Sequence, residues 1–335
     1  MNLPAVPVNP VLRRELVERM RGGRAAVVVT VYLLLLSGIL YLVYRVTRDS
    51  RTEPWESAVS QVASAGRGIF EWLVFFMVLL VLFLVPGVTS GAIAGERERQ
   101  TLVPLQITLL RPASILLGKV AASTAFLLLL LIATMPLLAV SYLIGGVTIG
   151  QVLTAVAMVA FIGLGLAAVT AGISACVRRV QAATVIAYGF TLLLVVGTLL
   201  VFAAASLVDT SRGTDEANAP SWILLPNPLA AVADAIEEDR GPQGIATTSP
   251  FDGLISLIEA EETGNIAFGE EVAVMDGPAG AVRVTFDENG NPVPLAPDND
   301  GIGFLWRSLG LLAVLAGISV AVGARRLRTP AAAER

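Results

Sequence analysis

The chain has 335 residues, of which 55% are hydrophobic and 15% are charged, and its mean hydropathy is +0.75. This composition excludes a soluble domain with a large core and indicates a membrane protein. Histidine is absent, which removes most zinc sites, histidine-based catalytic triads and histidine proton relays. Cys176 is the single cysteine, so there is no disulfide framework, and we expect it to be a small buried hydrophobe.

Residues 1–24 contain a predicted amphipathic helix that follows Asn9-Pro10, an N-cap with proline at the first helical position. Leu12, Leu16, Val17 and Met20 share one face, and Arg14, Glu15, Glu18 and Arg21 share the other. A basic amphipathic helix directly before a span is typical of an interfacial helix on the cytoplasmic leaflet. The alternative is a solvated arm that only supplies positive charge.

Six apolar segments are long enough to cross a bilayer, which needs about 20 helical residues. We expect them at about residues 25–44, 69–88, 120–144, 152–176, 183–207 and 302–323. The first is too long for a cleaved signal peptide and has no small-residue cleavage site after it. The predicted fold class is an all-α polytopic membrane protein, with spans one to five within residues 25–207 and a cytoplasmic tail at 324–335.

The polar segment between spans two and three has the features of a short helix. Thr101 is a suitable N-cap, Pro104 falls in the first turn, and Leu102, Leu105 and Leu109 repeat at helical spacing. Arg111-Pro112 should end this helix. A short helix across the mouth of a membrane bundle would be a docking element for a partner, whereas the alternative is an interfacial turn without one.

Two spans carry small residues at helical intervals, which would let another helix approach closely. In span four these residues are Gly163, Ala167, Ala171 and Ala175. In span six they are Gly310, Ala313, Gly317 and Ala321. We expect a helix-packing role for both ridges, and the sequence does not identify the partner helix.

Residues 208–301 differ from the rest of the chain because 18 of the 27 acidic residues lie there, against three basic ones. Asn227-Pro228 should begin a helix, residues 252–262 should form another, and residues 272–286 alternate around Asp276-Gly277 as a hairpin would. We therefore expect a small acidic α+β insert outside the membrane. Two Asp/Asn-rich stretches resemble the starts of calcium loops but lack the downstream glutamate, which favours turns.

The distribution of charge predicts the orientation. With the amino terminus inside, the inner segments hold 15 of the 23 Lys and Arg residues and only 5 of the 27 acidic residues. The positive-inside rule supports this arrangement, which puts both termini in the cytoplasm.

The spans offer little chemistry of their own. Their centres hold no charged residue, and Glu71, Lys119 and Arg307 fall near an interface, where long side chains reach water at little cost. Ion-coupled carriers, ion channels and membrane hydrolases are therefore disfavoured. Thr134, Ser141, Thr170 and Ser174 are better explained as helix–helix hydrogen-bonding groups. Gly118-Lys119-Val120 is not a phosphate-binding loop, so any energy must come from another polypeptide.

Several motifs, in their order and spacing, resemble the permease subunits of type 2 ABC exporters. They are Asn9-Pro10-Val11-Leu12-Arg13-Arg14-Glu15-Leu16, Gly95-Glu96-Arg97-Glu98-Arg99-Gln100-Thr101-Leu102, Leu109-Leu110-Arg111-Pro112 with Gly118-Lys119, and Leu225-Pro226-Asn227-Pro228-Leu229. The resemblance implies six spans, a second permease subunit that is identical or homologous, and two separate ATPase subunits. The chain departs from many members in its insert of about 94 residues, which leaves the substrate class open.

This resemblance implies that the coupling helix, which would fit a groove of the ATPase, lies at about residues 95–111. The implied ATPase contacts are Glu96, Arg97, Glu98, Arg99, Thr101, Leu102, Leu105 and Leu109. ATP and Mg²⁺ would bind the partner ATPase, so we expect no catalytic residue, cofactor or metal in this chain, and no nucleic-acid partner. The uncharged walls of the spans suit an amphiphilic substrate. We expect the protein to lie in a bacterial cytoplasmic membrane. The alternatives are a non-transporting scaffold or sensor whose insert binds a partner, and an energy-independent carrier or lipid scramblase.

Overall fold

The computed structural model describes residues 23–49, 58–101, 112–211, 220–237, 249–251, 254, 273–277, 280–286, 292–294 and 303–327. The predicted amphipathic helix before residue 23 lies outside these ranges. The predicted coupling helix at about 95–111 is not continuous, because a helix ends at Glu98 and the chain turns at residues 99–101, and residues 102–111 lie outside the described ranges. The predicted helix over residues 252–262 also falls there, apart from Leu254.

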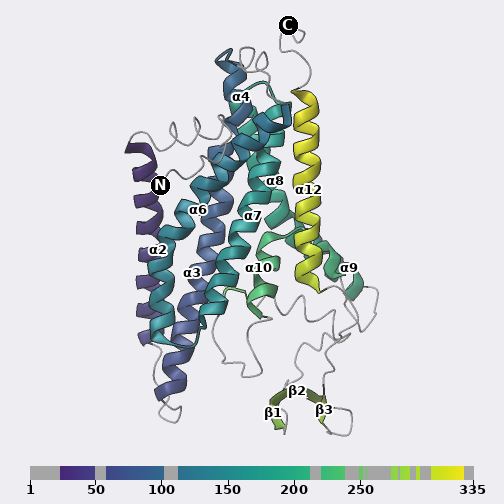
Figure 1. The fold of residues 1–335 in the computed structure, drawn as a ribbon. Coiled ribbons are helices and arrows are strands. Elements are labelled where there is room, and N and C mark those ends of the chain that lie inside the picture. Colours follow the sequence, from purple (N-terminus) through teal and green to yellow (C-terminus); the bar gives the residue numbers. More distant parts are fainter. Residues whose placement is uncertain are drawn as a thin grey trace, which may run out of the picture.

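Within the described residues, six long apolar helical segments run side by side in a bundle (Figure 1), in agreement with the predicted number of membrane spans. Five of the six spans are single helices. They are α2 (Gly23–Asp49), α3 (Ala58–Thr89), α6 (Pro112–Ile144), α7 (Ile149–Cys176) and α12 (Phe304–Arg326). The fifth span consists of α8 (Val180–Leu192), the π-helical turn η1 (Leu193–Gly197) and α9 (Thr198–Ser211). The helices start earlier or end later than the predicted spans because helices continue past the apolar segment.

Helix α7 is the centre of the bundle. It contacts α3, α6, α8 and α12, together with two short helices, α4 (Gly91–Glu98) and α10 (Pro228–Glu237). Of its most apolar 18-residue window, 61% is buried, against 11% for α2 and 17% for α12. The outer surfaces of α2 and α12 are therefore apolar and exposed in the isolated chain, as expected for helices that face lipid or another subunit.

The two predicted small-residue ridges lie in different surroundings. The ridge on α7 is buried, and the Gly163 Cα approaches α3 and α6 so closely that an added Cβ would lie 3.2 Å from Val81. Helix α12 packs on another face of α7, where a Cβ on Gly172 would lie 2.5 Å from the carbonyl oxygen of Ser319. The ridge on α12 (Gly310, Ala313, Gly317 and Ala321) is exposed in this chain. Its packing role stays a prediction for a contact outside the chain.

A tight turn joins α6 to α7 at the far end of the bundle from α4 (Figure 1). Gly145 and Gly146 adopt φ angles of 110° and 79°, a backbone region that favours glycine. A Cβ on Gly146 would lie 2.0 Å from the carbonyl oxygen of Ala63, so α3 also requires glycine there. Thr148 and Gln151 then form a capping box that begins α7.

Helix α2 is joined to α6 by a hydrogen bond in the middle of the bundle. The hydroxyl groups of Tyr32 and Thr134 lie 2.9 Å apart, and Thr134 also donates to the carbonyl oxygen of Leu130. Both side chains are buried, so the Tyr32 hydroxyl would lose its partner if Thr134 were apolar. Thr134 therefore acts as the predicted helix–helix hydrogen-bonding group.

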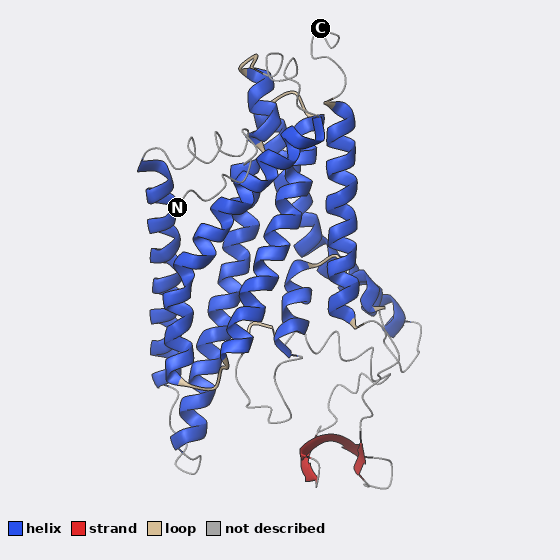
Figure 2. Ribbon diagram, in the orientation of Figure 1, coloured by secondary structure: helices blue, strands red, loops and turns tan. Residues whose placement is uncertain are grey.

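The acidic segment contains a helix and a small sheet (Figure 2). The helix predicted at Asn227-Pro228 is α10. The strands are β1 (Ala273–Gly277), β2 (Gly280–Phe286) and β3 (Pro292–Pro294), antiparallel in the order β1-β2-β3. The predicted hairpin forms, although β1 still pairs at Gly277 with Gly280, so the reversal comes after Asp276-Gly277 rather than there.

The expectations for Cys176, Glu71 and Lys119 are wrong. Cys176 is exposed at the end of α7 rather than buried. Glu71 and Lys119 do not extend to water, because both are buried and each is paired with a charge of opposite sign, Arg67 and Glu96 respectively.

Candidate functional site

The site is built around α4, which follows α3 after a break at Ser90. The Ser90 N–H donates to the carbonyl oxygen of Pro86, and its hydroxyl lies 2.8 Å from that of Thr184 on α8. Gly91 and Gly95 are four residues apart and therefore share one face of α4. A Cβ at either position would lie 3.7–3.8 Å from the Val180 methyl groups, so this face rests against the start of α8.

Ser174 of α7 supplies the amino-terminal cap that α4 lacks in its own sequence. The Ser90 side chain makes no capping hydrogen bond. Instead, the Ser174 hydroxyl oxygen accepts hydrogen bonds from the N–H groups of Ile93 and Ala94, each at 3.0 Å. Ser174 is fully buried, so its hydroxyl joins α7 to α4 without competition from water.

Two consecutive side chains of α4 cap the facing ends of α7 and α8. Arg97 donates from Nη1 to the carbonyl oxygen of Val177 at 2.9 Å and from Nη2 to that of Ala175 at 3.3 Å. Glu98 Oε1 accepts from the N–H of Val180 at 2.8 Å. A cation thus lies at the carboxyl end of α7 and an anion at the amino end of α8, which is the favourable sign at each helix dipole.

An ion pair joins α4 to α6. Lys119 Nζ lies 3.4 Å from Glu96 Oε1, and the Lys119 side chain is only 4% exposed. Thr101 folds back on the same carboxylate, because its N–H donates to the Glu96 carbonyl oxygen at 2.9 Å and its hydroxyl donates to Glu96 Oε2. Gln100 adopts a φ of 58° between them, so the chain turns sharply after α4. We call Glu96, Arg97, Glu98, Lys119 and Ser174 the α4 cluster.

The structure separates the predicted ATPase contacts into groups. Glu96, Arg97, Glu98 and Thr101 bind partners within this chain, and Glu98, Arg99 and Thr101 are exposed. The three leucines, Leu102, Leu105 and Leu109, lie outside the described residues. The sequence identified the charged residues of α4 but not their partners, because no local pattern marks the α7–α8 turn as one. Ser174 was expected to form a hydrogen bond between helices, and it does so with the backbone of α4.

A second buried polar group lies beside α10, at the π-helical turn of the fifth span. Asn227 Nδ2 donates to the Val195 carbonyl oxygen at 3.1 Å and to the Thr198 hydroxyl oxygen at 2.9 Å. Its Oδ1 accepts from the N–H of Leu229 at 2.9 Å, which caps α10. The Ser308 hydroxyl of α12 donates to the carbonyl oxygen of Leu225. Polar groups thus fix the start of α10 between the fifth and sixth spans.

The described residues offer no cluster of metal-ligating side chains. Among them, no group of three or more His, Cys, Asp or Glu side chains lies close enough to hold a metal ion. The buried side chains of Lys119 and Ser174 pair a charge and cap a helix, respectively. The architecture is thus that of a polytopic membrane protein with a polar, helix-capping element at one end.

A family model described as "ABC-2 family transporter protein" matches residues 45–325, which is most of the chain. The chain belongs to this family and is a multi-pass membrane component of an ABC transporter, of the permease type. Members of the family are transport components rather than catalysts, and they generally work with ABC ATPase subunits. Comparison with curated proteins gives no significant match.

Proposed function

We propose that this chain is the permease subunit of an ATP-driven exporter, which moves an amphiphilic substrate by alternating access. Separate ATPase subunits would supply the energy, because the sequence contains no phosphate-binding loop. A second permease subunit, identical or homologous, would complete the pathway. Both termini would face the cytoplasm of a bacterium, and residues 208–301 would face outward.

The observation that carries this proposal is the attachment of α4 to three spans at once. Its charged side chains bind α6 through Lys119, the end of α7 through Val177, and the start of α8 through Val180. The exposed turn at residues 99–101 directly follows these contacts. A partner that moves the segment after residue 98 would therefore displace the ends of three spans together.

Helix α7 would carry such a displacement through the membrane. Ser174 and Ala175 bind α4 at one end of α7. Ala155 and Met158, several turns away, line a cleft together with Val232 and Ala235 of α10. Because a helix moves largely as a rigid rod, a shift at α4 should alter the packing of α10 and α12 at the opposite end.

The geometry divides the predicted ATPase contacts by role. We assign Glu96, Arg97 and Glu98 to anchoring, since each already binds a partner within the subunit. Arg99 is exposed and would face the ATPase, together with Thr101, which is exposed although its hydroxyl binds Glu96. Leu102, Leu105 and Leu109 would provide the apolar side of the contact, as their helical spacing predicts.

Purification of the affinity-tagged chain from its native membrane tests the proposal. We expect an ABC ATPase to co-purify and to hydrolyse ATP in the complex. Leu105→Asp should release the ATPase or uncouple its hydrolysis, because a charge would be buried in an apolar contact. Ala332→Asp in the predicted cytoplasmic tail is the matched control and should retain it. A stable chain that captures no ATPase would contradict the proposal, as would normal coupling in Leu105→Asp.

A further inference from the structure

The fifth span carries one irregular turn, the π-helical segment η1, between the two α-helices α8 and α9. The N–H of Thr198 donates to the carbonyl oxygen of Leu193, five residues earlier, where an α-helix would use the residue four before it. Such a turn holds one residue more than an α-helical turn. Turns of this kind are rare and lie frequently at functional sites. The contacts of η1 therefore identify what keeps the extra residue in the span.

Two side chains donate to carbonyl oxygens of this turn. Thr198 donates from its hydroxyl to Leu194 at 2.7 Å, and Asn227 donates from Nδ2 to Val195 at 3.1 Å. The same amide group also donates to the Thr198 hydroxyl oxygen at 2.9 Å, so Asn227 orients the threonine as well. Inside a bilayer, carbonyl groups that leave the α-helical pattern need internal donors of this kind. Asn227 is the donor that comes from outside the fifth span.

Asn227 is attached to α10, because its other polar group caps that helix. Its Oδ1 accepts a hydrogen bond of 2.9 Å from the N–H of Leu229, and its backbone carbonyl oxygen accepts one from the N–H of Ala231. The residue is fully buried, and the three hydrogen bonds of its side chain fix which end of the amide faces η1. The amide therefore reaches Val195 only while α10 lies in its present position.

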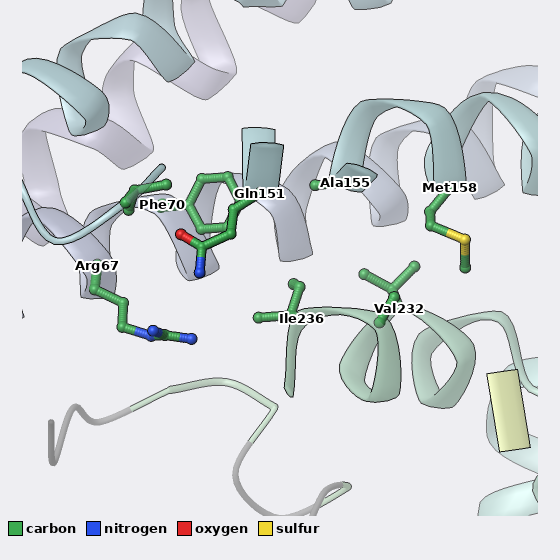
Figure 3. A pocket seen from close by; sticks show the side chains of 9 residues that line it. Arg67, Phe70, Gln151, Ala155, Met158, Val232 and Ile236 are labelled. Carbon is green, nitrogen blue, oxygen red and sulfur yellow. The ribbon is translucent and has the colours of Figure 1, made fainter. Parts of the chain in front are cut away.

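Helix α10 packs on α7 through apolar side chains. Val232 of α10 faces Ala155 and Met158 of α7 across a narrow cleft (Figure 3). Apolar contacts are non-directional, so they fix the position of α10 less strictly than the hydrogen bonds of Asn227 do. A displacement of α7 of the kind proposed above would therefore shift α10 and withdraw the amide from η1.

We propose that η1 is a two-state element. The Asn227 amide holds the π-helical turn, and its withdrawal lets the fifth span become a continuous α-helix, in which Val195 accepts from the N–H four residues later. The span then no longer absorbs its extra residue, so α9 turns relative to α8 by about 100°, the rotation of one α-helical residue. This link from α10 to the fifth span deepens the proposed function and rests on it for the movement of α10.

The rotation would change which side chains of α9 are buried. Phe202 is buried at present in an apolar cluster with Phe304 of α12, whereas Leu200 and Val201 are exposed. After the rotation each residue of α9 would occupy the place of the residue that now follows it. Val201 would then enter the apolar cluster in place of Phe202, and Leu200 would take the exposed place of Val201. Position 201 therefore reports the state of η1, and position 200 is its matched control.

Electron paramagnetic resonance of the purified full chain in lipid nanodiscs tests the proposal. A nitroxide is attached through Val201→Cys or Leu200→Cys, with Cys176→Ser to remove the native thiol, and its collisions with dissolved oxygen measure its exposure to lipid. Asn227→Ala should lower the oxygen accessibility at position 201 several-fold and leave that at position 200 unchanged. Unchanged accessibility at both positions in folded Asn227→Ala would overturn the proposal. Equal changes at both would overturn it too, because a rotation by one residue does not produce them.

Deletion of Val196 provides a second test, which does not depend on the folding of Asn227→Ala. Val196 lies within η1 and is exposed, so its deletion removes the extra residue with little loss of packing. The fifth span should then be a continuous α-helix with α8 and α9 in their present orientations. The label that replaces Val201 should stay exposed, and Asn227→Ala should not alter it, because no π-helical turn remains. Loss of exposure in the deletion chain, or a response to Asn227→Ala there, would overturn the proposal. None of these measurements involves an ATPase, so their failure is distinct from a failure of the tagged chain to capture one.

Discussion

Arg97 on α4 donates a hydrogen bond of 2.9 Å to the carbonyl oxygen of Val177, which directly follows the last residue of α7. The next residue, Glu98, accepts a hydrogen bond from Val180 at the start of α8. One short helix therefore caps two others, whose ends are about 80 residues away in the sequence. This arrangement makes α4 part of the bundle rather than a loose connection.

The cap provided by Arg97 should contribute measurably to stability. Arg97→Ala removes two hydrogen bonds and a cation at a helix carboxyl end, for an expected loss of about 1–2 kcal/mol. Scanning fluorimetry of the purified chain should show a lower melting temperature. Arg99→Ala is the matched control, because Arg99 is exposed, and it should melt like the unmodified chain. Equal melting temperatures for the two variants would show that the α7 cap is dispensable.

The Lys119–Glu96 pair should behave as a coupled unit. Lys119→Met and Glu96→Gln should each destabilise the chain, since each leaves one partner poorly compensated in a largely buried position. The double variant should recover part of the loss, with a coupling energy of about 0.5–3 kcal/mol in a double-mutant cycle. Strictly additive losses would mean that the two charges do not interact.

Glycine residues on α7 and α12 should differ in their tolerance of a methyl group. Gly172→Ala places a Cβ 2.5 Å from the Ser319 carbonyl oxygen, so α12 must move, at an expected cost of about 1–3 kcal/mol. Gly310→Ala meets no atom within 4 Å in this chain and should stabilise α12 slightly. If Gly310→Ala instead weakens an oligomer in cross-linking or native mass measurements, the α12 ridge faces another subunit, as its small residues predict.

Asn227 should hold the start of α10 against the fifth span. Asn227→Ala removes the donor to the Val195 carbonyl oxygen and the cap on Leu229, for an expected loss of about 1–3 kcal/mol in thermal unfolding. Thr198→Val removes one of the two acceptors of Nδ2 and should have a smaller effect. A larger loss in Thr198→Val than in Asn227→Ala would contradict the central role of the asparagine.

The spans and the start of α10 could be predicted because their signals are local. Hydropathy identified all six spans, and Asn227-Pro228 is a short cap motif that specifies a helix start. The partners of Arg97 and Glu98 could not be predicted, since they depend on how α4 packs against helices about 80 residues away. Ser174 was predicted to bond another helix, but the sequence did not identify α4 as that helix. The Arg67–Glu71 pair had a signal, the spacing of four residues on one helix, that could have been recognised.

The difference between local signals and contacts with distant residues also explains the wrong expectations for Cys176, Glu71 and Lys119. Each was interpreted from the hydropathy of its neighbours along the chain. Cys176 lies at the last position of α7, where it is exposed. Glu71 and Lys119 are buried because another side chain compensates each charge, a relation that hydropathy does not contain.

The proposed function requires the turn after α4 to lie in the cytoplasm and to contact an ATPase. Photo-cross-linking in intact cells tests it most directly, with a photoreactive amino acid in place of Arg99 and, as a control, in place of Tyr142, which is exposed near the opposite end of α6. We expect position 99 to cross-link to an ABC ATPase and position 142 not to do so. Cross-links from position 99 only to lipid or to proteins outside the cell, or to the ATPase from position 142 alone, would contradict it.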